Sequence, residues 1–173
     1  QHRNHFDALE DAADAFREGD EVEPDEIYIH LKRRLDREHG ITAQVVPVAA
    51  MPNALRYYDE TERRILLSQG LDYPNRVFQL THMLGLIEHR EAMDRLIAEA
   101  GIAGAREQAR CRVELANYFA AAVLMPYDRV LREAERSGYD IDQIAARFGV
   151  SFEQVCHRLT TLGREGRAGV PFF

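Results

Sequence analysis

Apolar residues recur every three or four positions along most of the chain, which is the spacing of one face of an α-helix. The first such stretch covers residues 2–18 and ends at Gly19. The same spacing predicts further helices over residues 24–39, 74–89, 91–100, 105–124 and 126–136. Because the stretch at 105–124 is apolar on most sides, we expect that helix to be buried.

The apolar period changes to that of β-strands between residues 41 and 68. Three short strands are predicted there, over residues 41–46, 54–58 and 64–67. The polar run at 59–62 predicts a hairpin between the last two strands. Successive strand residues point to opposite faces, so we expect Tyr57 to point away from its neighbours Arg56 and Tyr58.

Residues 140–162 predict a helix, a short turn and a second helix, with the A-x-x-F-G-V-S spacing of a helix-turn-helix. Ser151 and Gln154 form a capping start for the second helix. The pair could contact DNA or close the hydrophobic core as a structural unit. We favour the structural role, because the second helix offers Arg158 as its one arginine.

Composition narrows the class of protein. The chain has 173 residues, of which 46% are hydrophobic, which suits one folded domain with a core. No apolar run reaches the ~20 residues of a membrane span, and we expect no signal peptide. A net charge of −7 argues against a domain that itself grips nucleic acid. Two distant cysteines, Cys111 and Cys156, predict reduced, buried thiols in a cytoplasmic protein.

The stretch from Arg76 to His89, R-V-F-Q-L-T-H-M-L-G-L-I-E-H, is similar to an H-E-x-x-H zinc-peptidase helix that has lost its reactive residues. In such a helix two histidines four residues apart hold Zn²⁺, and the glutamate acts as general base. His82 stands at the first histidine position. Met83 replaces the glutamate and Leu86 replaces the second histidine.

A second motif, E-L-A-N-Y-F-A-A-A-V-L-M-P at 114–126, follows at a suitable distance. Together, F-x-L-x-H-x-L-G and A-N-x-F-A resemble the ImmA/IrrE-type metallopeptidase family. In that family a glutamate just before A-N-x-F-A is the third zinc ligand, and Leu115 occupies the position here. The resemblance implies an α+β fold, mostly helical, with a small three-stranded antiparallel sheet packed on the degenerate zincin-like helix and the helix-turn-helix-like pair at its C-terminal end.

The sequence from Ala116 to Phe173 resembles the sensory domain of the short-chain fatty acyl-CoA regulator family of bacterial transcription factors. This resemblance implies a ligand-sensing domain over 24–173, preceded by a linker helix over 1–23. It also implies a short-chain acyl-CoA or coenzyme A effector, no catalysis, no tightly bound cofactor and a homodimer. DNA would be bound by a separate upstream domain. Since the chain begins at Gln1 and ends on an apolar Val-Pro-Phe-Phe, we expect it to be part of a longer protein.

Apolar replacements at the former zinc positions predict a pocket of the kind that binds ligands. Tyrosine rings can stack on adenine, and arginines favour phosphates. The residues predicted to contact the ligand are His82, Gln79, Met83, Leu86, Leu115, Tyr118, Arg56, Tyr57, Tyr58 and Arg76. Each of the leucines and tyrosines could equally be a core residue. The basic cluster of Lys32, Arg33, Arg34 and Arg37 could be a solvated helix face or a phosphate contact.

Two other functions remain open from the sequence. A working metallopeptidase would have to recruit His82, His89 and Glu114 as ligands. His89 lies seven residues after His82, ~10.5 Å along the helix, which is too far for both to bind one ion. A DNA-binding or dimerising module would depend on residues 140–162 and on the first helix.

Overall fold

The computed structural model describes residues 5–17 and 23–163. The chain forms two compact units. One, which we call the sheet unit, comprises residues 22–80, and the other, the helical unit, comprises residues 1–21 and 81–173. The boundary falls within one helix, α3 (Tyr73–Glu88), which contributes its first half to the sheet unit and its second half to the helical unit.

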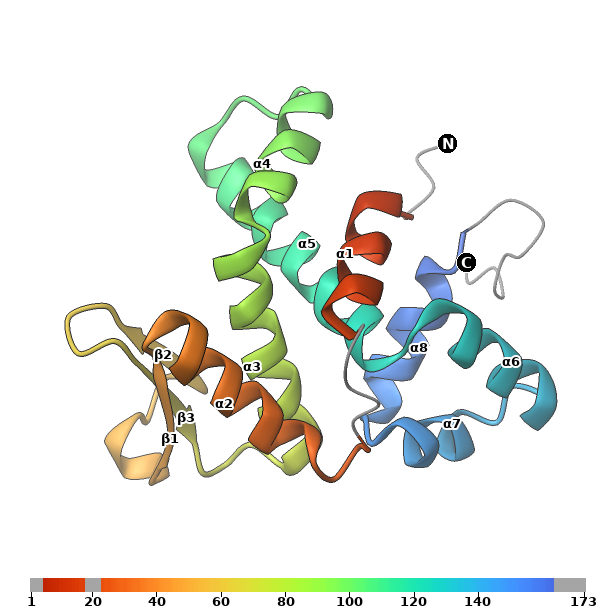
Figure 1. Ribbon diagram of the computed structural model, residues 1–173, viewed down its shortest axis with the longest axis horizontal. Coiled ribbons are helices and arrows are strands. Elements are labelled where there is room, and N and C mark those ends of the chain that lie inside the picture. Colours follow the sequence, from red (N-terminus) through yellow and green to blue (C-terminus); the bar gives the residue numbers. More distant parts are fainter. Residues whose placement is uncertain (1–4, 18–22, 164–173) are drawn as a thin grey trace. The chain divides into compact units, whose positions relative to one another are not determined.

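The sheet unit contains α2 (Ile27–His39), three strands and the 3₁₀ turn η1 (Val48–Ala50). The strands are β1 (Thr42–Val46), β2 (Arg56–Asp59) and β3 (Arg64–Ser68), in the order β1-β3-β2 (Figure 1). The predicted hairpin is confirmed, since β2 pairs antiparallel with β3. The sheet is mixed, however, because β1 runs parallel to β3. The expectation of a fully antiparallel sheet was therefore wrong for β1, which is joined to β2 through η1 and pairs with β3 instead.

The core of the sheet unit forms where α2 covers one face of the sheet. Ile65 and Leu67 of β3 are fully buried, as are Leu31 and Leu35 of α2. The helix ends at Gly40, whose φ of 61° lies in the left-handed region that glycine adopts without strain. The predicted helix over 24–39 is confirmed from Ile27 onward, with a turn before it.

The helical unit is organised around α5 (Ala105–Leu124). Three helices pack along it: α1 (Asp7–Arg17), α4 (Arg90–Glu99) and α8 (Phe152–Thr161) (Figure 1). Only the second half of α5 is buried, from Leu115 to Leu124, apart from half-buried Asn117, whereas residues 105–114 are exposed or half-buried. The expectation that the whole helix is buried was therefore wrong for its polar first half. Positions 2–4 and 18 of the predicted first helix lie outside the described residues.

The C-terminal helix pair follows the sequence prediction. After α6 (Tyr127–Ser137), α7 (Ile141–Phe148) and α8 pack against each other. Ser151 and Gln154 form a reciprocal capping box at the start of α8. Cys111 and Cys156 are free thiols, and both are partly exposed rather than buried. Among the described residues, no helix combines the length and apolar character that crossing a bilayer requires.

Candidate functional site

The two sequence motifs meet at a hydrogen bond between α3 and α5. Nδ1 of His82 lies 2.8 Å from Oδ1 of Asn117. His82 is 2% exposed, so this polar contact is made inside the helical unit. An amide oxygen at this distance accepts the proton that Nδ1 carries, and it thereby holds the imidazole in one tautomer and orientation. Asn117 thus fixes His82 much as an outer-shell partner fixes a metal-binding histidine.

A glycine lets the same two helices approach closely one turn further along α3. A Cβ atom at Gly85 would lie 2.6 Å from Cδ1 of Phe119. Real Cβ atoms do not come this near to an aromatic carbon, so the packing of α3 on α5 requires glycine at this position. His82 and Gly85 of the first motif and Asn117 and Phe119 of the second therefore form one packed frame between α3 and α5.

The positions that would carry zinc chemistry within this frame are apolar and packed. Met83 is 6% exposed and Leu115 is 3% exposed. Leu86 packs against the buried cluster to which Leu115 belongs. A catalytic zinc site needs three protein ligands and an open position, and His82 is the one suitable group at these four positions. The residues present therefore do not fit a catalytic zinc ion.

The substitute ligands considered from the sequence do not improve the fit. The imidazole of His89 packs on the ring of Phe119, with ring centroids 4.7 Å apart. Glu114 is exposed on the polar half of α5. Neither side chain therefore completes a zinc site with His82.

The ten residues predicted to contact a ligand divide evenly between the two units. His82, Met83, Leu86, Leu115 and Tyr118 belong to the helical unit. Tyr118 is buried, and its hydroxyl donates to Oε1 of Glu10 at 2.5 Å. Burial and the charge of Glu10 raise the pKa of Tyr118 far above its usual value. Its hydroxyl is thus engaged with α1.

The other five predicted residues, Arg56, Tyr57, Tyr58, Arg76 and Gln79, lie in the sheet unit. Nη1 of Arg56 donates to Oε1 of Gln79 at 2.9 Å, which joins β2 to α3 one turn before His82. Burial lowers the pKa of Arg56. Tyr57 is 55% exposed and Tyr58 is half-buried, in line with the expected alternation along β2.

Arg76 belongs to a cluster that sequence reasoning did not assemble, which we call the Tyr28 cluster: Tyr28, Lys32, Tyr73 and Arg76. The rings of Tyr28 and Tyr73 lie 6.1 Å apart, and Nζ of Lys32 is 5.7 Å from the centre of the Tyr28 ring. Burial raises the pKa of Tyr28, and the charge of nearby Arg76 opposes that shift. Tyr28 and Lys32 are four residues apart on α2, and Tyr73 and Arg76 are three residues apart on α3. These helical spacings were the sign of the cluster that the sequence contained.

Within residues 5–17 and 23–163, neither cation of the Tyr28 cluster forms an ion pair with a carboxylate. Nη2 of Arg76 donates to the carbonyl of Gln69 at 3.0 Å. Its Nε is buried and has no hydrogen-bond partner within residues 5–17 and 23–163. Over the same ranges, Lys32 forms no ion pair. Two cations beside two aromatic rings can bind phosphate groups and stack a base.

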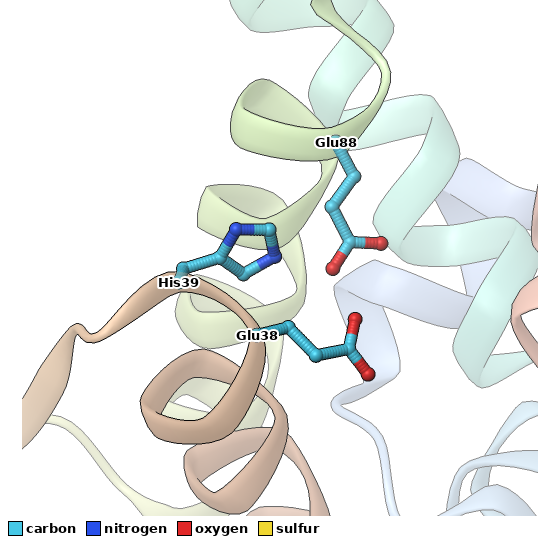
Figure 2. A group of neighbouring side chains, drawn as sticks. All are labelled: Glu38, His39 and Glu88. Carbon is cyan, nitrogen blue, oxygen red and sulfur yellow. The ribbon is translucent and has the colours of Figure 1, made fainter.

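A second candidate group is shown in Figure 2, which draws Glu38 and His39 from the last turn of α2 with Glu88 from the end of α3. Carboxylates and imidazole are ligands for divalent ions. Glu38 and His39 belong to the sheet unit and Glu88 to the helical unit, so neither unit by itself contains all three side chains. We therefore assign no metal site to these three residues.

The sheet unit also contains a pocket of about 410 Å³. It lies beside β2 and β3, and its walls are mostly apolar. The lining residues are Ala50, Met51, Pro52, Asn53, Ala54, Tyr57 and Leu66. Tyr57 is thus the one predicted contact residue that lines this pocket.

Comparison with known proteins identifies relatives of the whole chain. The RamB HTH-type transcriptional regulator of Mycobacterium tuberculosis is 30% identical over 172 residues, covering 99% of this chain and 36% of the relative. The Propionyl-CoA carboxylase regulator of Cereibacter sphaeroides is 33% identical over 174 residues, covering 98% of this chain and 35% of the relative. The PrpR HTH-type transcriptional regulator of M. tuberculosis is 38% identical over 117 residues, covering 68% of this chain and 24% of the relative. The chain thus spans about a third of the length of the first two relatives.

A solved structure described as a Mycobacterium tuberculosis transcriptional regulator has the same fold. It matches with a TM-score of 0.89 at 31% identity, over 98% of this chain and 51% of that one. The sequence profile of the peptidase M78 family, described as the IrrE N-terminal-like domain, matches residues 36–160. That range includes both motifs and the His82–Asn117 contact. The chain therefore belongs to the family of IrrE N-terminal-like domains.

Proposed function

We propose that this chain is the ligand-sensing domain of a bacterial transcription regulator that responds to short-chain acyl-CoA and performs no catalysis. The observation that carries the proposal is the frame of the two motifs. The His82–Asn117 hydrogen bond and the Gly85–Phe119 contact are present, while Met83 and Leu115 are buried where reactive groups would stand. A peptidase fold without its reactive groups can still bind a ligand, and binding is what a sensor requires.

The Tyr28 cluster supplies the chemistry that the nucleotide part of coenzyme A requires. Arg76 offers a guanidinium cation to a phosphate, and Lys32 adds a second positive charge beside the Tyr28 ring. The rings of Tyr28 and Tyr73 offer faces on which an adenine can stack. A relative of this chain is named as a regulator of propionyl-CoA carboxylase, which favours a propionyl-CoA or acetyl-CoA effector for this chain as well.

The acyl group can contribute only a small part of the affinity. Burial of one CH₂ group is worth ~0.8 kcal/mol, so propionyl-CoA should bind about fourfold tighter than acetyl-CoA if the extra carbon is buried. Most of the binding free energy must then come from the nucleotide and pantetheine parts. Free coenzyme A should therefore bind detectably, and the acyl group should adjust the affinity.

We assign contact with DNA to another part of the regulator, and not to the helix-turn-helix-like pair of α7 and α8. Arg158, the one arginine of α8, is 0% exposed and engaged with Glu10. A recognition helix reads base edges with exposed polar side chains. The α7–α8 pair of this chain instead closes the core of the helical unit. DNA binding by another part of the regulator, and a cytoplasmic location, follow from the kinds of protein that its relatives are named as.

Calorimetric titration with propionyl-CoA, acetyl-CoA and free coenzyme A tests the proposal. We expect heat of binding for all three, with propionyl-CoA tightest. Lys32→Gln and Arg76→Gln should each weaken binding of all three ligands, because they act on the shared nucleotide part. Arg132→Gln, an exposed position on α6 of the helical unit, is the matched control and should change nothing. Absence of binding by every acyl-CoA at millimolar concentration would sink the proposal.

Lys32 allows a second readout, because it is the only lysine in the chain. Acetylation with an amine-reactive ester, followed by peptide mass mapping, therefore reports on one side chain. Coenzyme A at saturating concentration should slow acetylation of Lys32, with the N-terminal amine as internal reference. If a ligand that binds by calorimetry leaves the acetylation rate of Lys32 unchanged, the ligand does not bind at the Tyr28 cluster.

Metal analysis of the same protein purified without chelator tests the non-catalytic assignment. Stoichiometric zinc bound through His82 would overturn it.

A further inference from the structure

Several elements of the sheet unit meet at one end of its sheet. β1 and β3 run parallel, and both end there. α2 begins at this end, because a link of two residues, 40–41, joins its other end to the start of β1. The hydroxyl of Tyr73, in the first turn of α3, donates to the carbonyls of Pro24 and Asp25, which precede α2, at 3.1 and 2.9 Å. The Tyr28 cluster therefore lies at this end of the sheet.

The pocket of about 410 Å³, which we call the η1 pocket, lies at the same end. Most of its lining comes from residues 50–54, which lead from η1 towards β2. The two residues after β3 contact both features. Nη2 of Arg76 donates to the carbonyl of Gln69 at 3.0 Å. A Cβ atom at Gly70 would lie 3.5 Å from Cγ2 of Val48, the first residue of η1. The Tyr28 cluster and the η1 turn are thus linked within one unit by two consecutive residues.

The surroundings of the η1 pocket are uncharged and largely apolar. The segment from Ile41 to Leu55 contains no charged residue, although 29% of the whole chain is charged, and most of the segment is exposed. Asn53 and Tyr57 are the pocket-lining residues with polar side chains. A mostly apolar hollow with few polar groups is typical of small-molecule sites, whose volumes are about 300–1,000 Å³.

We propose that the η1 pocket receives the acyl group and the adjoining pantetheine of the effector, while the Tyr28 cluster holds the nucleotide. This placement rests on the acyl-CoA effector proposed above. An acyl-CoA is anionic at its phosphates, uncharged along its pantetheine and apolar at its acyl end. The end of the sheet changes in the same order, from Lys32 and Arg76 to an uncharged, mostly apolar pocket. Charged groups thereby meet charged groups, and apolar surface meets apolar surface.

The former zinc positions are less suited to the acyl group. Met83 is 6% exposed and Leu115 is 3% exposed, so both side chains are packed in the core of the helical unit. An acyl group placed there would have to displace packed side chains, which is costly in a close-packed interior. The η1 pocket is already open and requires no such rearrangement.

The placement predicts how affinity depends on the length of the acyl chain. Each further CH₂ group that enters the η1 pocket should tighten binding about fourfold. Calorimetry with free coenzyme A, acetyl-CoA, propionyl-CoA and butyryl-CoA measures this rise. We expect it to continue from propionyl-CoA to butyryl-CoA, because the pocket volume of about 410 Å³ leaves room for a longer chain.

Ala54→Phe fills the η1 pocket with a ring and should abolish the rise, while free coenzyme A binds as it does to the parent. Ala49→Phe is the matched control, because Ala49 is an exposed residue of η1 that does not line the pocket. Circular dichroism on both variants checks that the fold is intact. If Ala54→Phe keeps the rise, or if Ala49→Phe also abolishes it, the acyl group lies elsewhere. A parent that binds coenzyme A without any dependence on chain length overturns this placement alone, whereas a parent that binds none of the four ligands overturns the proposed function with it.

Thiol protection tests the placement without filling the pocket. In a background with Cys111→Ser and Cys156→Ser, Ala54→Cys is alkylated with iodoacetamide. The ligand is S-butyl-coenzyme A, a thioether that cannot transfer an acyl group to the thiol. At ten times its Kd about a tenth of the sites are free, so alkylation should slow about tenfold. Desulfo-coenzyme A, which ends before the sulfur, should protect far less, and Ala49→Cys should not be protected by either ligand. Equal protection of Ala54→Cys by the two ligands, or none by either, overturns the placement.

Discussion

Glu10 and Arg158 form a bidentate ion pair across 148 positions of sequence, with both side chains fully buried. Nη1 of Arg158 donates to Oε1 of Glu10 at 2.7 Å, and Nη2 donates to Oε2 at 2.9 Å. The hydroxyl of Tyr118 donates to the same carboxylate, and Nε of Arg158 donates to the carbonyl of Met125. Three helices, α1, α5 and α8, are thereby tied to one polar centre.

Loss of one partner of this pair should be costly. Arg158→Met leaves the carboxylate of Glu10 buried without its counter-charge, which should lower the free energy of unfolding by about 3–5 kcal/mol. The triple variant Glu10→Leu, Tyr118→Phe, Arg158→Met removes the carboxylate and the hydroxyl as well, so we expect its stability to return close to that of the parent. Urea denaturation measures both. A triple variant as unstable as Arg158→Met would show that the polar centre itself, and not an orphaned charge, governs stability.

The same pair predicts how stability depends on pH. Burial by itself raises the pKa of Glu10, but the hydrogen bonds and charge of Arg158 outweigh it, and the pKa falls below its usual 4.5. A depressed carboxyl pKa contributes stability that is present above the unfolded-state pKa and is lost as pH falls through the folded-state value. We therefore expect the urea midpoint to drop as pH is lowered from about 5 to about 3.

The pH effect has an internal control. Asp59 and Glu133 also have lowered pKa values, through hydrogen bonds to the backbone of Glu62 and to Arg136 respectively. These half-buried carboxylates remain in the triple variant, in which Glu10 is the one carboxylate removed. The difference in acid sensitivity between the parent and the triple variant should therefore isolate Glu10. Identical pH profiles for the two proteins would contradict the assignment.

Local sequence patterns predicted most of the fold because the relevant signals are local. The spacing of apolar residues located the helices, and Ser151 with Gln154 marked the start of α8. The direction of β1 could not be predicted in this way. Its parallel pairing with β3 depends on the sheet that forms around β3 and not on residues 42–46 alone. The ion pair of Glu10 and Arg158 was likewise invisible, because each residue taken alone is typical of a solvated helix face.

Only part of the candidate site could be predicted, because some of its contacts form only when the helices pack together. His82, Met83, Leu86 and Leu115 could be placed because they replace known positions of two motifs. Asn117 belonged to a motif too, but its contact with His82 required the packing of α3 on α5. The Tyr28 cluster requires α2 and α3 to lie side by side in the sheet unit, which single-helix patterns do not specify.

Gly85 provides a test of how tightly the two motifs pack. Gly85→Ala brings a methyl group against Phe119 and should destabilise the helical unit by about 1–3 kcal/mol, since overpacking forces neighbours to move. Gly70→Ala is the control, because its Cβ would meet Ser68 and Val48 at an ordinary 3.5 Å. Thermal unfolding separates the two variants. Adding Phe119→Leu to Gly85→Ala should recover part of the loss, and no recovery would argue against a steric cause.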